Sequence, residues 1–126
     1  MALPDYVRKG KVQAAVGDFS ALTLSAKTGI TAYAGGGQTN ATQLTASINH
    51  VTVVASAADS VKLPKSAPGA ICIVTNGDSA DSMQVFGYGT DTINDVATAT
   101  GVAQAAGKTA VYVCPVAGKW YRALSA

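Results

Sequence analysis

The sequence contains no glutamate, few leucines and little charge of either sign. Charged residues make up 13% of the 126 residues, which is about half of the roughly 25% found in an average soluble domain. Strong helix formers are therefore scarce, whereas alanine, threonine, valine, serine and glycine dominate a chain that suits strands and turns. The length allows one domain with a hydrophobic core, and we expect this domain to be all-β. The sparse charge indicates either a surface covered by neighbouring subunits or a neutral surface rich in serine and threonine.

The weak charge and the lack of long apolar runs exclude two classes of partner. A net charge of +2 gives little attraction for nucleic acid, and we interpret Arg8, Lys9 and Lys11 as a solvated segment. No run approaches the roughly 18 apolar residues of a membrane span. The N-terminus also lacks the apolar core of a signal peptide. We expect a protein that is made in the cytoplasm and binds neither nucleic acid nor membrane.

The two cysteines, Cys72 and Cys114, lie in the strand-like runs AICIV and VYVCPV. Thiols stay reduced in the cytoplasm, and a free cysteine packs as a small hydrophobic residue. We therefore expect both thiols to be buried and reduced.

An acidic and glycine-rich stretch, TNGDSADSMQVFGYGTDTINDV from Thr75 to Val96, is a candidate metal or phosphate site. An EF-hand loop ends on a glutamate, which this chain lacks. A phosphate-binding loop needs glycines that lead into a helix, with lysine or serine beyond them, and GYGTDT has neither feature. Because aspartate, glycine and asparagine suit β-turns, we predict two turns that flank a strand from Met83 to Tyr88. A calcium site built from separate loops is the alternative.

Candidate catalytic residues are few. His50 is the only histidine, and no Gly-x-Ser-x-Gly elbow accompanies it. No set of cysteines and histidines has the spacing of a zinc site. Asp91 and Asp95 form a pair of carboxylates such as acid–base chemistry requires, yet nothing distinguishes them from other loop acids. We expect no enzymatic activity, no catalytic residue, no metal and no cofactor.

The sequence pattern changes after residue 43. Residues 1–43 contain short alternations and the run Gly35–Gly37, which is costly to order, so we predict an N-terminal arm with a glycine-rich linker. In residues 44–126, strand-like runs recur about every 8–12 residues, with turn signals between them, which is typical of a sandwich or barrel. We predict that this second part is a β-sandwich of the jelly-roll type.

Individual strands are predicted for SINHVTVVAS, SVKLP and SMQVFGY. AICIVTN and TAVYVCPV are apolar at successive positions, which predicts strands covered on both faces. The segment AGK before the strand KWYRAL predicts a tight hairpin with Gly118 at a position of positive φ. The segment VATATGVAQAAGKTA is predicted to form a strand, a loop and a second strand.

The order of these strands and turns resembles a module of structural proteins from tailed bacteriophages. The resemblance covers Gly29 to Tyr121 and rests on INHVTVVASAADSVKLP, a following PG, a VTN strand, QVFGYGTDTIN and the closing GKTAVYVC…AGKWY. It implies a β-sandwich unit of a capsid decoration protein, a head fibre or a tail appendage. It implies no active site.

Two functions follow from this resemblance. The first is a decoration or cement protein on the exterior of the capsid. It would bind the major capsid protein and would itself be a homo-oligomer, a dimer or trimer, in the virion. The alternative is a module of a tail fibre, tail spike or head fibre that binds the host surface. A length of one module plus an arm favours the first, because a fibre has a longer shaft or repeats.

The arm is expected to contact these partners through its apolar residues, which are Leu3, Tyr6, Val7, Phe19, Leu22 and Leu24. Packing of these side chains on their own domain is the alternative.

Overall fold

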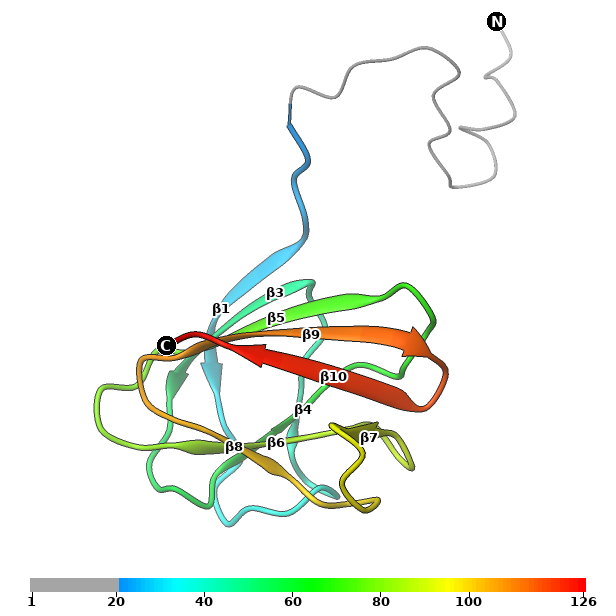
Figure 1. Cartoon of the computed structure of the whole chain (residues 1–126). Helices are drawn as coiled ribbons and strands as arrows, with labels where there is room; N and C mark the ends of the chain where they lie inside the picture. The colour runs from blue at the N-terminus through cyan, green and yellow to red at the C-terminus, as the bar shows by residue number, and fades with distance from the viewer. Residues whose placement is uncertain (1–20) are drawn as a thin grey trace, which may run out of the picture.

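A computed structural model describes residues 21–126 of the chain (Figure 1). The described part folds into ten strands, contains no helix, and so has no helical segment long and apolar enough to cross a membrane. The prediction of an all-β protein is confirmed.

The strands form two sheets. The larger sheet has six strands, which are in spatial order β1 (Ala26–Thr31), β3 (Ile48–Val53), β5 (Ile71–Asn76), β9 (Thr109–Val116), β10 (Lys119–Leu124) and β7 (Thr92–Ile93). The smaller sheet has four strands, which are β2 (Thr42–Gln43), β4 (Ser60–Lys62), β6 (Met83–Phe86) and β8 (Val102–Gln104).

The first six strands alternate between the two sheets, so that this part of the chain winds like a β-solenoid (Figure 1). Strands β1, β3 and β5 are parallel neighbours in the larger sheet, and β2, β4 and β6 are parallel neighbours in the smaller one. Ala26 lies opposite Ile48, and Ile48 lies opposite Ile73, so successive turns advance by 22 and 25 residues. The chain then reverses, since β8 and β9 run antiparallel to β6 and β5, and β10 adds a hairpin.

The two packed sheets agree with the sequence prediction, but the strands do not follow the predicted jelly-roll order. A jelly roll consists of antiparallel Greek keys, whereas the first three strands of each sheet are parallel here. Parallel strands need a crossover connection. In this chain the crossover is the strand of the opposite sheet together with its two turns. The spacing of strands in a sequence is the same for both arrangements.

The sheets begin at Ala26, before the predicted domain boundary at Leu44, because β1 and β2 both pair with later strands. The run Gly35–Gly37, predicted as a linker, lies in an ordered turn where Ser60 Oγ donates a hydrogen bond of 2.8 Å to the Gly37 carbonyl. A Cβ atom at position 36 would lie 2.5 Å from the carbonyl oxygen of Ala58. The glycines therefore allow close packing of two turns, and the arm within the described residues is residues 21–25.

The core lies between the sheets, where alternate residues of each strand point inward. The buried apolar side chains of the larger sheet include Val51, Cys72, Val74, Tyr112 and Trp120, and those of the smaller sheet include Val61, Leu63, Met83 and Val85.

The other face of the larger sheet is open. Ile71 on β5 is 52% exposed and Val113 on β9 is 40% exposed, so the prediction that these two strands are covered on both sides is wrong for this single chain. Their apolar outward residues form an exposed surface.

The predicted turns are present. Gly118 has a φ of 86° in the hairpin between β9 and β10, as predicted. Strand β8, a turn and β9 follow one another in the segment predicted as strand, loop and strand. Turns also flank β6 on both sides, as predicted for the acidic stretch.

Buried amides join the two sheets. Gln104 on β8 donates hydrogen bonds from Nε2 to the carbonyls of Val74 (2.8 Å) and Lys108 (2.9 Å), and its Oε1 accepts one from the Tyr112 hydroxyl (2.9 Å). Asn76 Nδ2 donates to the carbonyl of Gln104 at 3.0 Å. Because both amide side chains are fully buried, these bonds replace water and are costly to break.

Candidate docking surface

The aspartates of the acidic stretch cap turns. Asp78 accepts hydrogen bonds from the backbone NH groups of Asp81 (2.9 Å) and Ala80 (2.8 Å), which lower the pKa of its carboxyl group. Asp91 accepts bonds from the backbone NH (2.8 Å) and the hydroxyl (2.9 Å) of Ser66. Residues 21–126 contain no group of three or more His, Cys, Asp or Glu side chains arranged to hold a metal ion.

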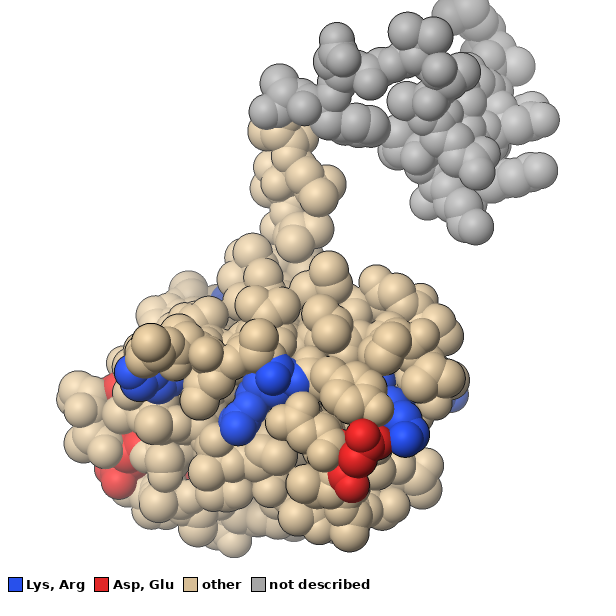
Figure 2. Space-filling view, in the orientation of Figure 1, with Lys and Arg blue, Asp and Glu red and all other residues tan. Residues whose placement is uncertain are grey.

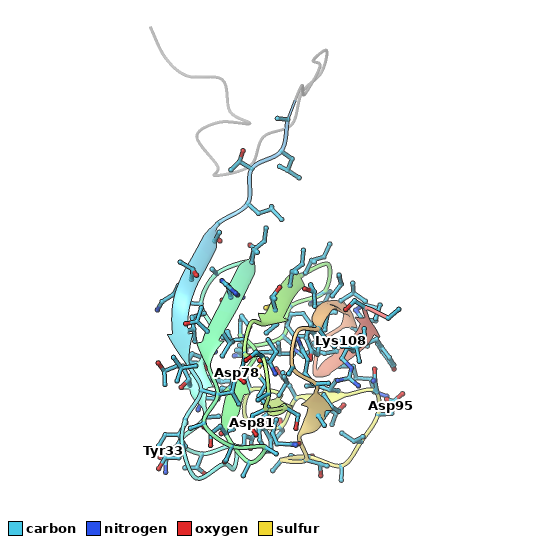
Figure 3. All side chains as sticks on the ribbon, turned by 90° about the vertical axis from the view of Figure 1, so that its left-hand side faces the viewer. Tyr33, Asp78, Asp81, Asp95 and Lys108 are labelled. Carbon is cyan, nitrogen blue, oxygen red and sulfur yellow. The ribbon has the colours of Figure 1, made fainter. Side chains whose placement is uncertain are left out.

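Asp95 has different partners from Asp91. Its carboxylate forms an exposed ion pair of 2.7 Å with Lys119 and accepts a hydrogen bond of 3.0 Å from the Tyr121 hydroxyl. Lys119 and then Tyr121 lower the pKa of Asp95. Figure 3 shows Asp95 on a different side of the domain from Asp78 and Asp81. The two carboxylates considered from the sequence as an acid–base pair are therefore each used in a separate local contact.

His50 lies on the outward face of β3 and is exposed. Its Nδ1 atom is 2.9 Å from the Thr28 hydroxyl oxygen, and its ring packs against Gly77. Within the described residues, no serine or carboxylate is hydrogen-bonded to this ring, so the arrangement of a catalytic triad is not assembled around His50.

The outward side of the larger sheet carries a cluster of apolar side chains contributed by three neighbouring strands. Cross-strand pairing places Ile48 opposite Ile73, Ile73 opposite Val111, and Ile71 opposite Val113. Residues directly opposite each other on one face of a sheet are in contact distance. We refer to these five residues as the apolar face.

The strands that carry the apolar face contain no charged residue, although the adjacent strand β10 carries Lys119, and Tyr121 opposite Val113 donates a hydrogen bond to Asp95. Strands β3, β5 and β9 contain no aspartate, glutamate, lysine or arginine. Along the same side of the sheet, the next row is His50, Thr75 and Thr109, which is polar but carries no permanent charge. In Figure 2, lysine, arginine and aspartate lie mainly across the middle and lower parts of the domain, and the surface directly below the arm is uncharged apart from a basic patch at its left margin. Contiguous apolar surface of this kind is typical of an interaction site.

The arm carries two exposed leucines. Leu22 is 81% exposed and Leu24 is 39% exposed, and residues 21–25 lead away from the start of β1 (Figure 1). The backbone carbonyl of Ser25 accepts a hydrogen bond of 2.9 Å from the NH of Ile48, so the arm starts beside the apolar face. Of the predicted contact residues, Leu3, Tyr6, Val7 and Phe19 lie outside the described residues.

The sequence pointed to the arm leucines but not to the apolar face. Its signal was present in AICIVTN and TAVYVCPV, where apolar residues occupy both sides of the strand. This pattern indicates that both sides need to be covered, but it does not identify which side is covered by the chain's own second sheet.

Cys72 and Cys114 are buried and free, as predicted. Burial raises the pKa of the Cys72 thiol to about 12, which leaves almost no thiolate near neutral pH. We therefore expect neither cysteine to react with iodoacetamide at pH 8 in the native protein, and both to react in denaturant without reductant. Mass spectrometry of the intact protein counts the added groups. A disulfide-linked peptide pair after non-reducing digestion would contradict this expectation.

Comparison of the chain with protein-family models, with curated proteins and with solved structures finds no match. Its class is therefore described by its own architecture: an all-β protein of two sheets, with a solenoid-like winding, an antiparallel end and an apolar arm beside an uncharged sheet face.

Proposed function

We propose that this protein is a decoration (cement) protein of a tailed-bacteriophage head, which binds the major capsid protein on the outside of the shell and stabilises it. The observation that carries the proposal is the uncharged apolar face with the exposed leucine arm beside it, in a chain whose sequence resembles phage structural modules. An apolar surface without charge favours a protein partner rather than nucleic acid, which binds through lysine and arginine contacts to phosphate.

A cement protein resists the outward load on a shell only if it bridges two or more subunits. Specific protein interfaces bury on the order of 1,200–2,000 Å² in total. The arm projects from the domain, so it can reach a subunit that the domain itself does not touch (Figure 1). Extended segments of this type bind either by packing side chains or by adding a strand to a neighbouring sheet.

Attachment through such surfaces depends little on ion pairs. Salt at 1 M reduces the Debye length to about 3 Å, which removes long-range attraction between surface charges. Apolar contacts persist under these conditions. We therefore expect binding to the shell to survive high salt.

The experiment compares the full chain with a chain that lacks residues 1–24. This deletion ends before β1 (Ala26–Thr31), so every pairing of the two sheets is retained. We expect the full chain to co-sediment with capsids at both low and high salt. The deleted chain should stay folded by circular dichroism and should no longer co-sediment. Equal binding by both chains would show that the arm has no part in attachment, and failure of the full chain to bind would overturn the proposal.

The alternative is a module of a tail fibre, tail spike or head fibre that binds the host surface. The solenoid-like winding favours it, because a winding of this kind can be lengthened by further turns into a shaft. Gold-labelled antibody on intact virions separates the two functions. Label spread over the head supports the cement protein, whereas label confined to the tail or to a few projections supports the alternative.

A further inference from the structure

We propose that the apolar face binds the arm of a second copy of this chain, so that copies associate by exchanging their arms. This inference concerns self-association and stands whether or not the protein binds a capsid. It assigns a partner to the five residues Ile48, Ile71, Ile73, Val111 and Val113.

The register of the strands places the arm at the same level as the apolar face. Ala26 is opposite Ile48, which is opposite Ile73. Leu24 precedes Ala26 by two residues, and Ile71 precedes Ile73 by two residues. Because the strands are parallel, Leu24 and Ile71 therefore lie at the same height along the sheet, just before the level at which β3 begins.

Alternation of side chains along the chain assigns the arm leucines to the outward side of the sheet. Side chains alternate along an extended chain, so Leu22 and Leu24 share a side with Thr28 if the alternation continues from β1 into the arm. Thr28 contacts His50 on the outward side, at 2.9 Å between Oγ1 and Nδ1. The leucines thus extend the apolar face beyond the edge of the domain.

A second copy fits this surface because each chain carries one arm and one face. Both surfaces lack charge, since residues 21–26 and strands β3, β5 and β9 contain no ionised side chain, and burying them together leaves no charge without water. Figures 1 and 3 show, from directions 90° apart, that the arm leads away from the sheets rather than across them. A closed symmetric oligomer therefore covers Leu22, Leu24 and the apolar face of every copy by the same contact, which leaves the arm residues before residue 21 as the part proposed to reach the shell.

Addition of the arm to a sheet edge is disfavoured. The free edge of the larger sheet is β1, and its pairing with β3 is irregular between Lys27 and Ile30, where Gly29 has a φ of 71°. Bulges of this kind are a common protection of edge strands against further pairing. The arm is therefore expected to bind through its leucine side chains on the face.

Sedimentation velocity over a range of protein concentrations tests the association. We expect the full chain to form a dimer or trimer, and Leu22→Asp and Ile71→Lys each to weaken association at least about tenfold, since each places a charge in an apolar contact. Val53→Lys is the matched control, because Val53 is 48% exposed but lies at the other end of β3. Unchanged circular dichroism and melting temperature confirm that each variant is folded. A full chain that remains monomeric at every concentration would overturn the proposal.

Cross-linking between two populations identifies the contact. Chains with Leu22→Cys are mixed with chains with Ile71→Cys and oxidised; the native cysteines are buried and do not compete. We expect a disulfide between the two chain types, and none when Tyr88→Cys, on the exposed loop after β6, replaces Ile71→Cys. A disulfide within one monomeric chain that carries both substitutions would show that the arm covers its own face, contrary to the proposal.

The two proposals fail separately. Variants that lose self-association but still co-sediment with capsids would leave the cement function intact. Loss of capsid binding by a chain that still self-associates would overturn only that function.

Discussion

Replacing Trp120 with alanine is expected to lower the free energy of unfolding by about 3–5 kcal/mol. Trp120 on β10 is the largest of the fully buried side chains in the described residues, and its partner across the sheet is the buried Ile93 on β7. Its removal leaves a cavity between the sheets that the surrounding strands cannot fill without moving. Because small domains are stable by only about 5–15 kcal/mol, this variant should be close to unfolding at room temperature.

Urea denaturation followed by circular dichroism measures this loss, since the substitution also removes the only tryptophan. Trp120→Phe is the first control. The indole Nε1 has no hydrogen-bond partner, so phenylalanine removes volume without breaking a bond and should cost much less. Leu124→Ala, on an exposed position of the same strand, should change stability by no more than about 0.5 kcal/mol. A loss below about 1 kcal/mol for Trp120→Ala would show that the core tolerates the cavity.

Replacing Gln104 with leucine is expected to cost about 3 kcal/mol, because it leaves several buried groups without a partner. Leucine cannot donate to the carbonyls of Val74 and Lys108, nor accept from the Tyr112 hydroxyl. The three bonds connect Gln104 on β8 with Val74 on β5, with Tyr112 on β9 and with Lys108 in the turn between β8 and β9. Burial also raises the pKa of Tyr112, so its hydroxyl remains a protonated donor that needs an acceptor.

A double-mutant cycle with Tyr112→Phe isolates one bond of this network. Tyr112→Phe alone should cost about 1–2 kcal/mol, since it leaves Gln104 Oε1 buried and unpaired. In the double variant neither group remains unpaired at that contact. We therefore expect the combined loss to be smaller than the sum of the single losses by about 1 kcal/mol. Additive losses would show that the bond between Tyr112 and Gln104 contributes nothing.

The strands that sequence patterns predicted are those with strong apolar or β-branched runs. Strands β3, β5, β6, β9 and β10 were placed correctly because each has such a run bounded by turn residues. Strands β1 and β2 were missed, and so was β7 (Thr92–Ile93), which lies in a stretch predicted as a turn. The sequence AKTGIT of β1 has a single large apolar residue, and β2 consists of only two residues, Thr42 and Gln43. Both are held as strands by pairing with later parts of the chain, which a local pattern does not contain.

Local sequence patterns also did not indicate whether neighbouring strands run parallel or antiparallel. Inward-facing residues such as Val61 and Val85 alternate in the same way whether neighbouring strands are parallel or antiparallel. Their parallel pairing results from the length of the connections and from the strand of the other sheet that each connection contains. For the docking surface, the apolarity of Ile71 and Val113 was evident from the sequence, but their exposure depends on where the second sheet packs.

The reversal of the chain after β6 determines when the fold can form during synthesis. The winding from β1 to β6 comes first, but the strand that pairs with β5 in the larger sheet is β9, and β9 with β10 brings Tyr112 and Trp120 into the core. A nascent chain that has released only the winding therefore exposes the inner side of β5 and the edge of the sheet. The larger sheet can therefore be completed only after the ribosome has released β10, and until then the unpaired edge of β5 is the kind of surface that promotes aggregation.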